Sequence, residues 1–141
     1  MARIEIELPD TYHFATEISV RIGDINFAGH LAHDALLTLL HEARARLFHE
    51  HGYTELDVEG HGIIMADAGL IYRSEVHWGE SLRCDIAVRD FTGKGCDIVY
   101  RITEAASGRE VARAKTGIVF FDYNAGEPVA VPAGWRKKFA G

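Results

Sequence analysis

Cysteine and proline are scarce in this chain, and each scarcity excludes a class of structure. The 141 residues include two cysteines and three prolines. Cys84 and Cys96 cannot build a disulfide framework, and their spacing is not that of a zinc-binding pair. We expect both to lie in the core as small apolar side chains. The prolines stand at positions 9, 128 and 132, so none interrupts the middle of the chain.

Long hydrophobic runs are also missing. No apolar stretch approaches the roughly 20 residues that a helix needs to cross a bilayer. The opening MARIEIELPD lacks a basic lead-in followed by an apolar run, so it does not resemble a secretory signal. We therefore expect a cytoplasmic protein with no membrane partner. The formal net charge of −6 makes broad attraction to nucleic acid or to an anionic membrane unfavourable.

Several motifs of well-known enzyme classes do not occur. The sequence has no G-x-S-x-G, no P-loop and no G-x-G-x-x-G, which argues against serine hydrolases and nucleotide enzymes of those types. Eight histidines are present, but no H-E-x-x-H motif occurs. The pair His30/His33 has weak spacing for a metal, and His49 and His51 do not share a helix face. We expect no metal ion.

The composition that remains is typical of one globular domain. Hydrophobic residues make up 48% of the chain and charged residues 26%, as in ordinary soluble proteins. A chain of this length can bury one substantial core. No internal repeat, low-complexity tract or linker divides the sequence, so we predict a single domain over residues 1–141.

Hydrophobic periodicity predicts a strand and then a long helix. Residues 14–22 (FATEISVRI) alternate apolar and polar side chains, as a strand with one buried face does. Residues 33–53 then change to spacings of three and four, and Leu36, Leu40, Ala43 and Leu47 form an apolar stripe. His33 or Asp34 stands where an N-cap or first-turn residue belongs, and Gly52 stands where a helix commonly ends in a left-handed conformation.

The period of two returns after residue 61. Residues 62–76, 81–91, 95–105 and 109–123 alternate, and the connections HWGE, TGKG and ASG have the composition of antiparallel hairpin turns. We expect Gly69 at a bulge or close approach, and a short helix in residues 131–139 starting at Pro132. The order of strand, long helix and four-strand meander predicts an α+β fold, with an antiparallel sheet of about five strands wrapped around one central helix.

The most chemically dense stretch is RIGDINFAGHLAHD, residues 21–34, between the first strand and the helix. Together with HEARAR, residues 41–46, it resembles the hotdog-fold acyl-CoA thioesterases of the 4-hydroxybenzoyl-CoA thioesterase type. The family pattern R-x-x-D-x-D-x-x-G-[HV]-[VL] is read here from Arg21 to Leu31, and HEARAR is close to the family's E-x-A-R, with Glu42, Ala43 and Arg44. The resemblance extends over most of the chain, from about residue 12 to residue 135. It implies a hotdog fold and hydrolysis of an acyl-CoA or acyl-carrier thioester to free acid and thiol.

One position departs from the family pattern. The second aspartate of the motif, which in the family acts as base or nucleophile, falls here on Asn26. An amide can orient a water or hydrogen-bond a carbonyl, but it cannot usefully accept a proton. The resemblance therefore leaves Asp24 or Glu42 as the catalytic carboxylate. Each also has an ordinary interpretation, because Asp24 could pair with Arg21 or the loop amides and Glu42 could pair with Arg46 at i,i+4.

Other residues near this stretch have weaker assignments. The backbone N–H groups of Gly29 and His30, just before the helix, are candidates for stabilising an oxyanion, although Gly29 could be a plain turn residue. Asn26 itself could serve only to bond its own turn. Asp67 is conspicuous on an apparent core strand, where a carboxylate needs a partner, and it could reach a site shared between subunits. A further set could meet coenzyme A phosphates but stays unassigned: Arg73, Arg101, Arg113, Lys115 and residues 136–138.

Two other functions stay open. The stretch also resembles the G-D-x-N-P-x-H-x-[DN] motif of R-specific enoyl-CoA hydratases, with Asp24, Asn26 and His30 in similar places. The proline is missing, however, and His30 stands one residue too far from Asp24. The second alternative is a non-catalytic acyl-CoA binding module. The resemblance implies a homodimer or a larger assembly such as a tetramer, and no cofactor apart from coenzyme A as part of the substrate.

Overall fold

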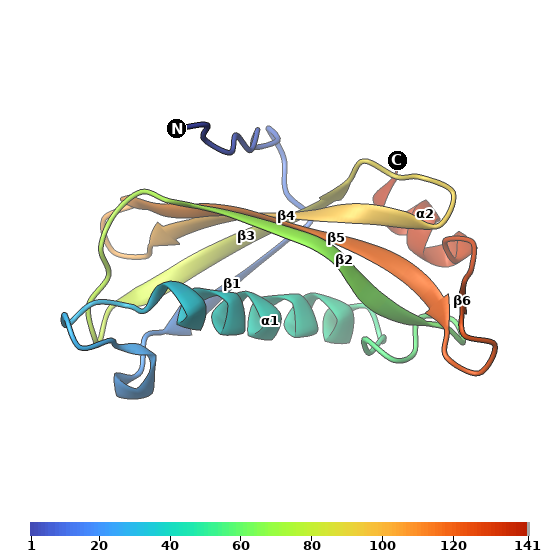
Figure 1. Cartoon of the computed structure of the whole chain (residues 1–141), viewed down its shortest axis with the longest axis horizontal. Coiled ribbons are helices and arrows are strands. Elements are labelled where there is room, and N and C mark those ends of the chain that lie inside the picture. The colour runs from blue at the N-terminus through green and yellow to red at the C-terminus, as the bar shows by residue number, and fades with distance from the viewer. Residues whose placement is uncertain (141) are drawn as a thin grey trace.

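The computed structural model describes residues 1–140 and places one long helix, α1, under one antiparallel sheet (Figure 1). A single 3-10 turn at Ile22–Asp24 precedes α1 (His33–Glu50), and a short helix α2 (Ala133–Phe139) follows the sheet. The sheet contains β1 (Phe14–Ser19), β2 (Gly62–Tyr72), β3 (Ser81–Arg89), β4 (Gly95–Glu104), β5 (Glu110–Asp122) and the two-residue β6 (Glu127–Pro128). This arrangement confirms the predicted α+β hotdog fold.

The strand order differs from the expected four-strand meander. The order is β1-β3-β4-β5-β2, with β6 also paired to β5, so β2 lies at an edge and pairs with β5 rather than β3. The two sides of β3 are taken by β1 and β4, which leaves no place for β2. The prediction that HWGE forms a hairpin was therefore wrong. Residues 73–80 instead cross three strand spacings, about 14 Å, which eight extended residues span easily because they reach about 26 Å.

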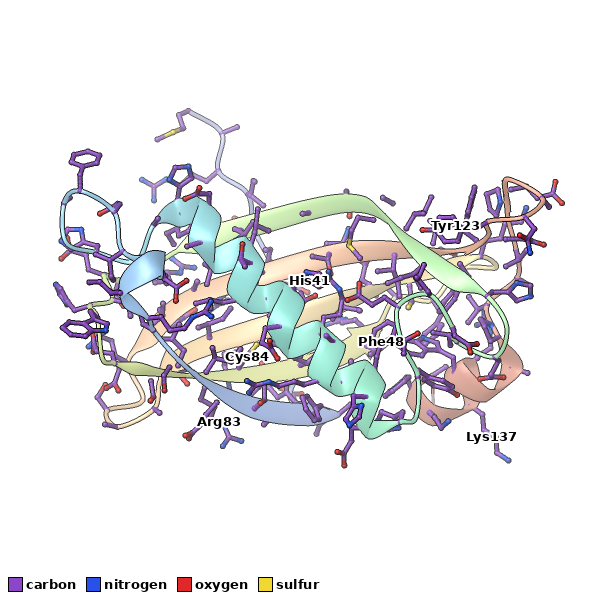
Figure 2. The ribbon with its side chains drawn as sticks, turned by 90° about the horizontal axis from the view of Figure 1, so that it is seen from below. His41, Phe48, Arg83, Cys84, Tyr123 and Lys137 are labelled. Atoms are coloured by element: carbon purple, nitrogen blue, oxygen red, sulfur yellow. The ribbon has the colours of Figure 1, made fainter. Side chains whose placement is uncertain are left out.

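The core lies between α1 and the concave face of the sheet (Figure 2). The helix stripe of Leu36, Leu40, Ala43 and Leu47 is at most 2% exposed, as the periodicity predicted. The expected inward residues of β3 and β4 are also buried, and they are Leu82, Cys84, Ile86, Val88, Cys96, Ile98, Tyr100 and Ile102. Both cysteines are free thiols in this core, as predicted.

Helix α1 begins and ends close to the predicted residues. Gly52 has a φ of +77° just after the helix, and the Gly52 N–H donates to the His49 carbonyl at 3.0 Å. The N-cap residue is Ala32, whose side chain makes no capping hydrogen bond. His33 and Asp34 therefore lie in the first turn, where the Asp34 carboxylate interacts favourably with the helix dipole.

Two expectations for β2 were wrong. The irregularity in its pairing lies between Met65 and Asp67, not at Gly69. Because a bulge adds one residue, it reverses the alternation that follows it, and Asp67 points outward with a side chain that is 62% exposed. Asp67 Oδ1 lies 2.7 Å from the Lys115 ammonium and accepts the Gly117 N–H at 3.0 Å. It is a surface ion-pair residue rather than a core carboxylate.

Candidate active site

Asp24 is buried in the 3-10 turn that leads from β1 towards α1. One of its carboxylate oxygens accepts the Arg21 N–H at 2.9 Å, and the Arg21 guanidinium lies 3.5 Å away. The Asp24 backbone carbonyl accepts the Ala32 N–H at 2.9 Å. The residue thus ties the start of the loop to the residue that precedes the helix. These are the contacts of its ordinary, structural interpretation.

Asn26 organises the loop between the turn and the helix. Its side-chain oxygen accepts the N–H groups of Ala28 at 3.0 Å and of His30 at 3.2 Å. Its backbone carbonyl accepts the Gly29 N–H at 3.0 Å, and Gly29 has a φ of +85°, which glycine adopts without strain. The backbone N–H groups of Gly29 and His30, which are the candidates for stabilising an oxyanion, therefore both donate hydrogen bonds to Asn26. A substrate carbonyl would bind the His30 amide by displacing the Asn26 side chain.

A groove of about 360 Å³ opens beside this loop at the start of α1. We call it the helix-start groove, and it is lined by Asn26, residues 30–33, Leu36, residues 72–76 and Val111. Its volume lies within the range of small-molecule sites. The groove brings Asn26 and His30 together, as the sequence predicted. Tyr72, from β2, closes one side by donating its hydroxyl to the His33 carbonyl at 2.8 Å.

Glu75 also lines the helix-start groove, and sequence reasoning missed it. Its carboxylate lies 3.2 Å from His30 Nε2. Glu75 and His77 flank Val76, which is 2% exposed. Because alternate side chains of an extended segment point to opposite sides, this E-V-H pattern was the available signal that both polar groups face outward.

Glu42 lies away from the groove. It stands nine residues after His33 on α1, about 13 Å along the helix axis. Its carboxylate accepts a 2.8 Å hydrogen bond from Arg46, which also donates to Thr16 Oγ1 at 2.8 Å. Glu42 lines two other hollows beside α1, of about 730 and 520 Å³. The structure therefore does not bring Glu42 and Asn26 together within one chain.

Arg44, in the HEARAR stretch of α1, is buried between α1 and the sheet. Its guanidinium donates to Glu55 and to the Tyr100 hydroxyl, both at 3.3 Å, and that hydroxyl lies 2.8 Å from Thr116 Oγ1. Burial raises the pKa of Tyr100 and outweighs the opposing effect of Arg44, so the phenol stays neutral. The signal for this network was an arginine on the apolar stripe of the helix.

Neither cysteine is suited to nucleophilic catalysis. Burial raises the pKa of the Cys84 thiol far above its ordinary value and that of Cys96 to about 12. Because the thiolate is the nucleophile, both groups are inert at neutral pH.

Four of the cations left unassigned by the sequence pair with carboxylates of the sheet. Arg73 and Arg113 pair with Glu110, Arg101 pairs with Asp85, and Lys115 bridges Asp67 and Asp97. Only Arg73 among these four lines the helix-start groove.

Comparison with solved structures gives the same fold in several thioesterases. A 1,4-dihydroxy-2-naphthoyl-CoA thioesterase from Synechocystis matches with a TM-score of 0.82 and 19% identity, over 90% of this chain and 95% of that one. A DHNA-CoA thioesterase from Staphylococcus aureus matches with a TM-score of 0.79 and 18% identity, over 89% and 87%. A thioesterase superfamily protein from Jannaschia sp. matches with a TM-score of 0.83 and 16% identity, over 94% and 84%.

Two sequence comparisons give different results. A search of curated proteins finds no match. The family model of the thioesterase-like superfamily, in contrast, matches residues 20–139. None of the helices within residues 1–140 is long and apolar enough to span a membrane. The family match covers the turn, α1 and the sheet from β2 onward. The chain therefore belongs to the thioesterase-like superfamily, and this membership supports thioester hydrolysis as its activity.

Proposed function

We propose that this protein hydrolyses an acyl-CoA thioester to a free acid and coenzyme A. The observation that carries the proposal is the helix-start groove, lined by Asn26 and His30, in a chain that the family model matches from residue 20 to 139. No cofactor takes part in the proposed reaction, because coenzyme A enters as part of the substrate.

In the proposed reaction, the thioester carbonyl binds at the loop before α1. The backbone N–H groups of His30 and Gly29 exchange their hydrogen bonds with Asn26 for hydrogen bonds to the developing oxyanion. Backbone donors and the helix dipole stabilise the negative charge there. The released Asn26 side chain holds the attacking water. A carboxylate takes one proton from that water, the carbon–oxygen bond forms and the carbon–sulfur bond breaks. The departing thiolate then receives a proton.

Of the two carboxylates considered, we favour Glu42 as the base. Asp24 is 6% exposed and already accepts hydrogen bonds from Arg21, so water reaches it poorly. Glu42 is half exposed beside open hollows. It is about 13 Å along α1 from the start of the groove, so it would act on the groove of a second copy of the chain.

A homodimer is therefore part of the proposal, with a tetramer as a possible larger assembly. The free edge of β2 supports it, because residues 65–68 are exposed at the end of the sheet order and an unpaired edge strand readily pairs with another chain. We also propose a cytoplasmic location, since both cysteines are unpaired thiols as in a reducing compartment.

The hydratase alternative is less well supported by the geometry. That chemistry needs an aspartate and a histidine acting on one water, yet the His30 ring pairs with Glu75 while Asp24 pairs with Arg21. The binding-module alternative rests only on the presence of Asn26 instead of an aspartate at the motif position. A measurement of thiol release decides it.

The experiment is thiol release from a panel of aromatic and aliphatic acyl-CoAs by the wild-type chain and by Asp24→Asn and Glu42→Gln variants. We expect turnover of at least one acyl-CoA, lost in Glu42→Gln while folding is kept. Saturable binding without thiol release would overturn the proposal in favour of a binding module. Uptake of water by crotonyl-CoA would favour the hydratase.

A further inference from the structure

His30, Glu75 and His77 converge at the rim of the helix-start groove. One potential ligand atom of each lies within 4.8 Å of the others, and the two imidazole rings meet edge to face with centroids 5.4 Å apart. Two imidazoles and one carboxylate are a donor set that zinc and other divalent transition metals favour. We propose that these three side chains bind a divalent transition-metal ion, with Zn²⁺ as the ion that fits best. This proposal does not depend on thioester hydrolysis.

The backbone holds the two contributing segments together. The Leu31 N–H donates to the Val76 carbonyl at 2.8 Å, which joins the loop carrying His30 to the β2–β3 connection carrying Glu75 and His77. Val76 is buried, so its neighbours on both sides are directed outward. Backbone pairing and core packing thus hold the two segments that carry the three groups side by side.

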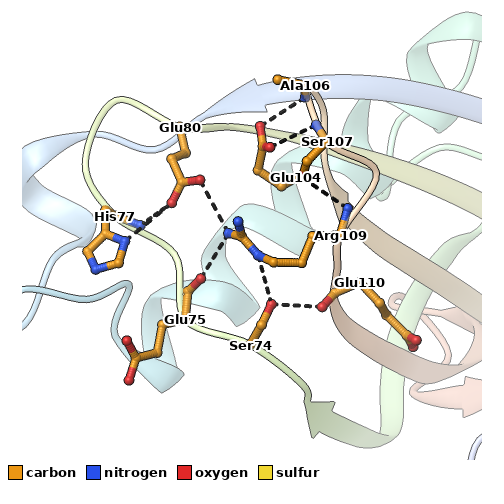
Figure 3. A network of polar contacts seen from close by, with 9 residues as sticks. All are labelled: Ser74, Glu75, His77, Glu80, Glu104, Ala106, Ser107, Arg109 and Glu110. Atoms are coloured by element: carbon orange, nitrogen blue, oxygen red, sulfur yellow. Dashed lines mark hydrogen bonds and ion pairs between the residues drawn. The ribbon is translucent and has the colours of Figure 1, made fainter.

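Glu80 and Arg109 support the metal-binding groups from behind (Figure 3). The Glu80 carboxylate accepts the His77 backbone N–H at 2.8 Å and lies 3.5 Å from His77 Nδ1. Arg109 donates to Glu80 at 3.2 Å and to the Glu75 carbonyl at 3.0 Å. A carboxylate on one imidazole nitrogen orients the other towards a metal, as outer-shell carboxylates do in zinc sites. His77 would then ligate through Nε2.

The spacing of the three groups fits a metal after a small closure. Two ligands at about 2.1 Å from a tetrahedral zinc ion lie about 3.4 Å apart, so a pair at the 4.8 Å limit must approach by about 1.4 Å. The side chains of Glu75 and His77 are 66% and 60% exposed and can rotate by that amount. Three protein ligands leave a fourth position for water on the side of the groove.

The test is titration of the untagged full-length chain with Zn²⁺ by calorimetry, and with Co²⁺ by visible absorption. The variants are His77→Ala and Glu75→Gln. The matched control is His41→Ala, because His41 also pairs with a glutamate, Glu55, at 2.8 Å, but belongs to no three-ligand group within residues 1–140.

We expect one saturable Zn²⁺ site per chain. We also expect visible absorption bands typical of Co²⁺ with a low coordination number. His77→Ala should weaken Zn²⁺ binding by about 100-fold or more and Glu75→Gln by at least about tenfold, with circular dichroism unchanged. His41→Ala should bind like the wild type. The absence of saturable binding, or equal affinities of His77→Ala and His41→Ala, would overturn the metal site. Thiol release is measured separately, so failure of either proposal is distinguishable.

Discussion

Residue 26 is an asparagine where the family pattern has an aspartate, and the two side chains differ by an amide nitrogen in place of a carboxylate oxygen. The Asn26 oxygen accepts two backbone N–H groups, and an aspartate oxygen would accept the same two hydrogen bonds. Asn26→Asp should therefore fold like the wild type and add a base beside the groove. Because a positioned base contributes roughly 10²–10⁴-fold, we expect the kcat for thiol release to rise at least about tenfold.

The control for this prediction is Asp24→Asn in the same assay, since it changes charge at the neighbouring position without supplying a base. Thermal unfolding of each variant separates activity from stability. An unchanged or lower kcat in a stable Asn26→Asp variant would contradict the idea that this loop positions the attacking water.

Arg44 and Arg46 stand on the same helix in opposite environments. Arg44 is buried against Glu55 and Tyr100, while Arg46 pairs with Glu42 at the surface. Arg44→Ala removes the guanidinium from the partly buried Glu55 carboxylate and from the buried Tyr100 hydroxyl and leaves its space unfilled, so we expect the free energy of unfolding to fall by about 3 kcal/mol. Arg46→Ala should cost about 0–1 kcal/mol. Urea unfolding of both variants measures the difference, and equal midpoints would be inconsistent with a buried arginine.

The sequence indicated which residues of the loop before α1 make local contacts, while their roles in a reaction stay predictions. The Asp24, Asn26 and Gly29 contacts lie within a few residues of chain, and a motif can encode them. Glu75 and His77 approach His30 across more than 40 residues, through a backbone pairing that depends on where β2 and β3 lie. No spacing rule within one segment could therefore predict the cluster of His30, Glu75 and His77.

At the scale of elements, periodicity predicted the five longer strands and α1, but not the two-residue β6 and not all of the neighbours in the sheet. An alternating run of apolar and polar residues indicates which face of a strand is buried, and β3 and β4 bury the predicted residues. The alternation does not indicate which strand lies beside it. The placement of β2 beside β5 depends on β1 having taken the free side of β3, and that is a property of the assembled sheet.

Helix α2 gives a prediction about pH. His13 Nδ1 accepts the Val88 N–H at 3.0 Å, and the rings of His13 and His51 both pack edge-on against Phe139 of α2. Burial lowers the pKa of both histidines, the positive charge of His51 further lowers the pKa of His13, and that of Lys138 further lowers the pKa of His51. Below about pH 6.5 the unfolded chain therefore binds more protons than the folded one, and the free energy of unfolding falls as the pH falls.

We expect the Tm to decrease as the pH is lowered from about 7.5 to about 5. The double variant His13→Gln/His51→Gln should lose much of this dependence, although its Tm at pH 7.5 also falls. His41→Gln/His49→Gln, with two exposed histidines of α1, serves as the control and should keep the wild-type slope. Identical slopes in all three proteins would show that the protonation of His13 and His51 does not couple to folding.

At the scale of the whole molecule, the separation of Glu42 from the helix-start groove has one consequence that mixing can test. If each site takes Asn26 from one chain and Glu42 from the other, Asn26→Ala and Glu42→Gln homodimers both have two defective sites. A heterodimer of the two has one site with both defects and one with neither. An equal, fully exchanged mixture should therefore regain roughly a quarter of wild-type thiol release, because half of its dimers carry one intact site.

The heterodimer fraction is measured by native mass spectrometry, where the dimer should weigh twice the 15.7 kDa of the chain. Mixing Asn26→Ala with Asp24→Asn is the control, because Asp24 and Asn26 lie on one loop of one chain. If both residues are needed for the loop, every site of this heterodimer contains one damaged loop, so mixing should restore no activity above the mean of the two components. Activity of the Asn26→Ala and Glu42→Gln mixture equal to the mean of its two components, with heterodimers present, would place the base within the same chain and remove Glu42 from the proposed reaction.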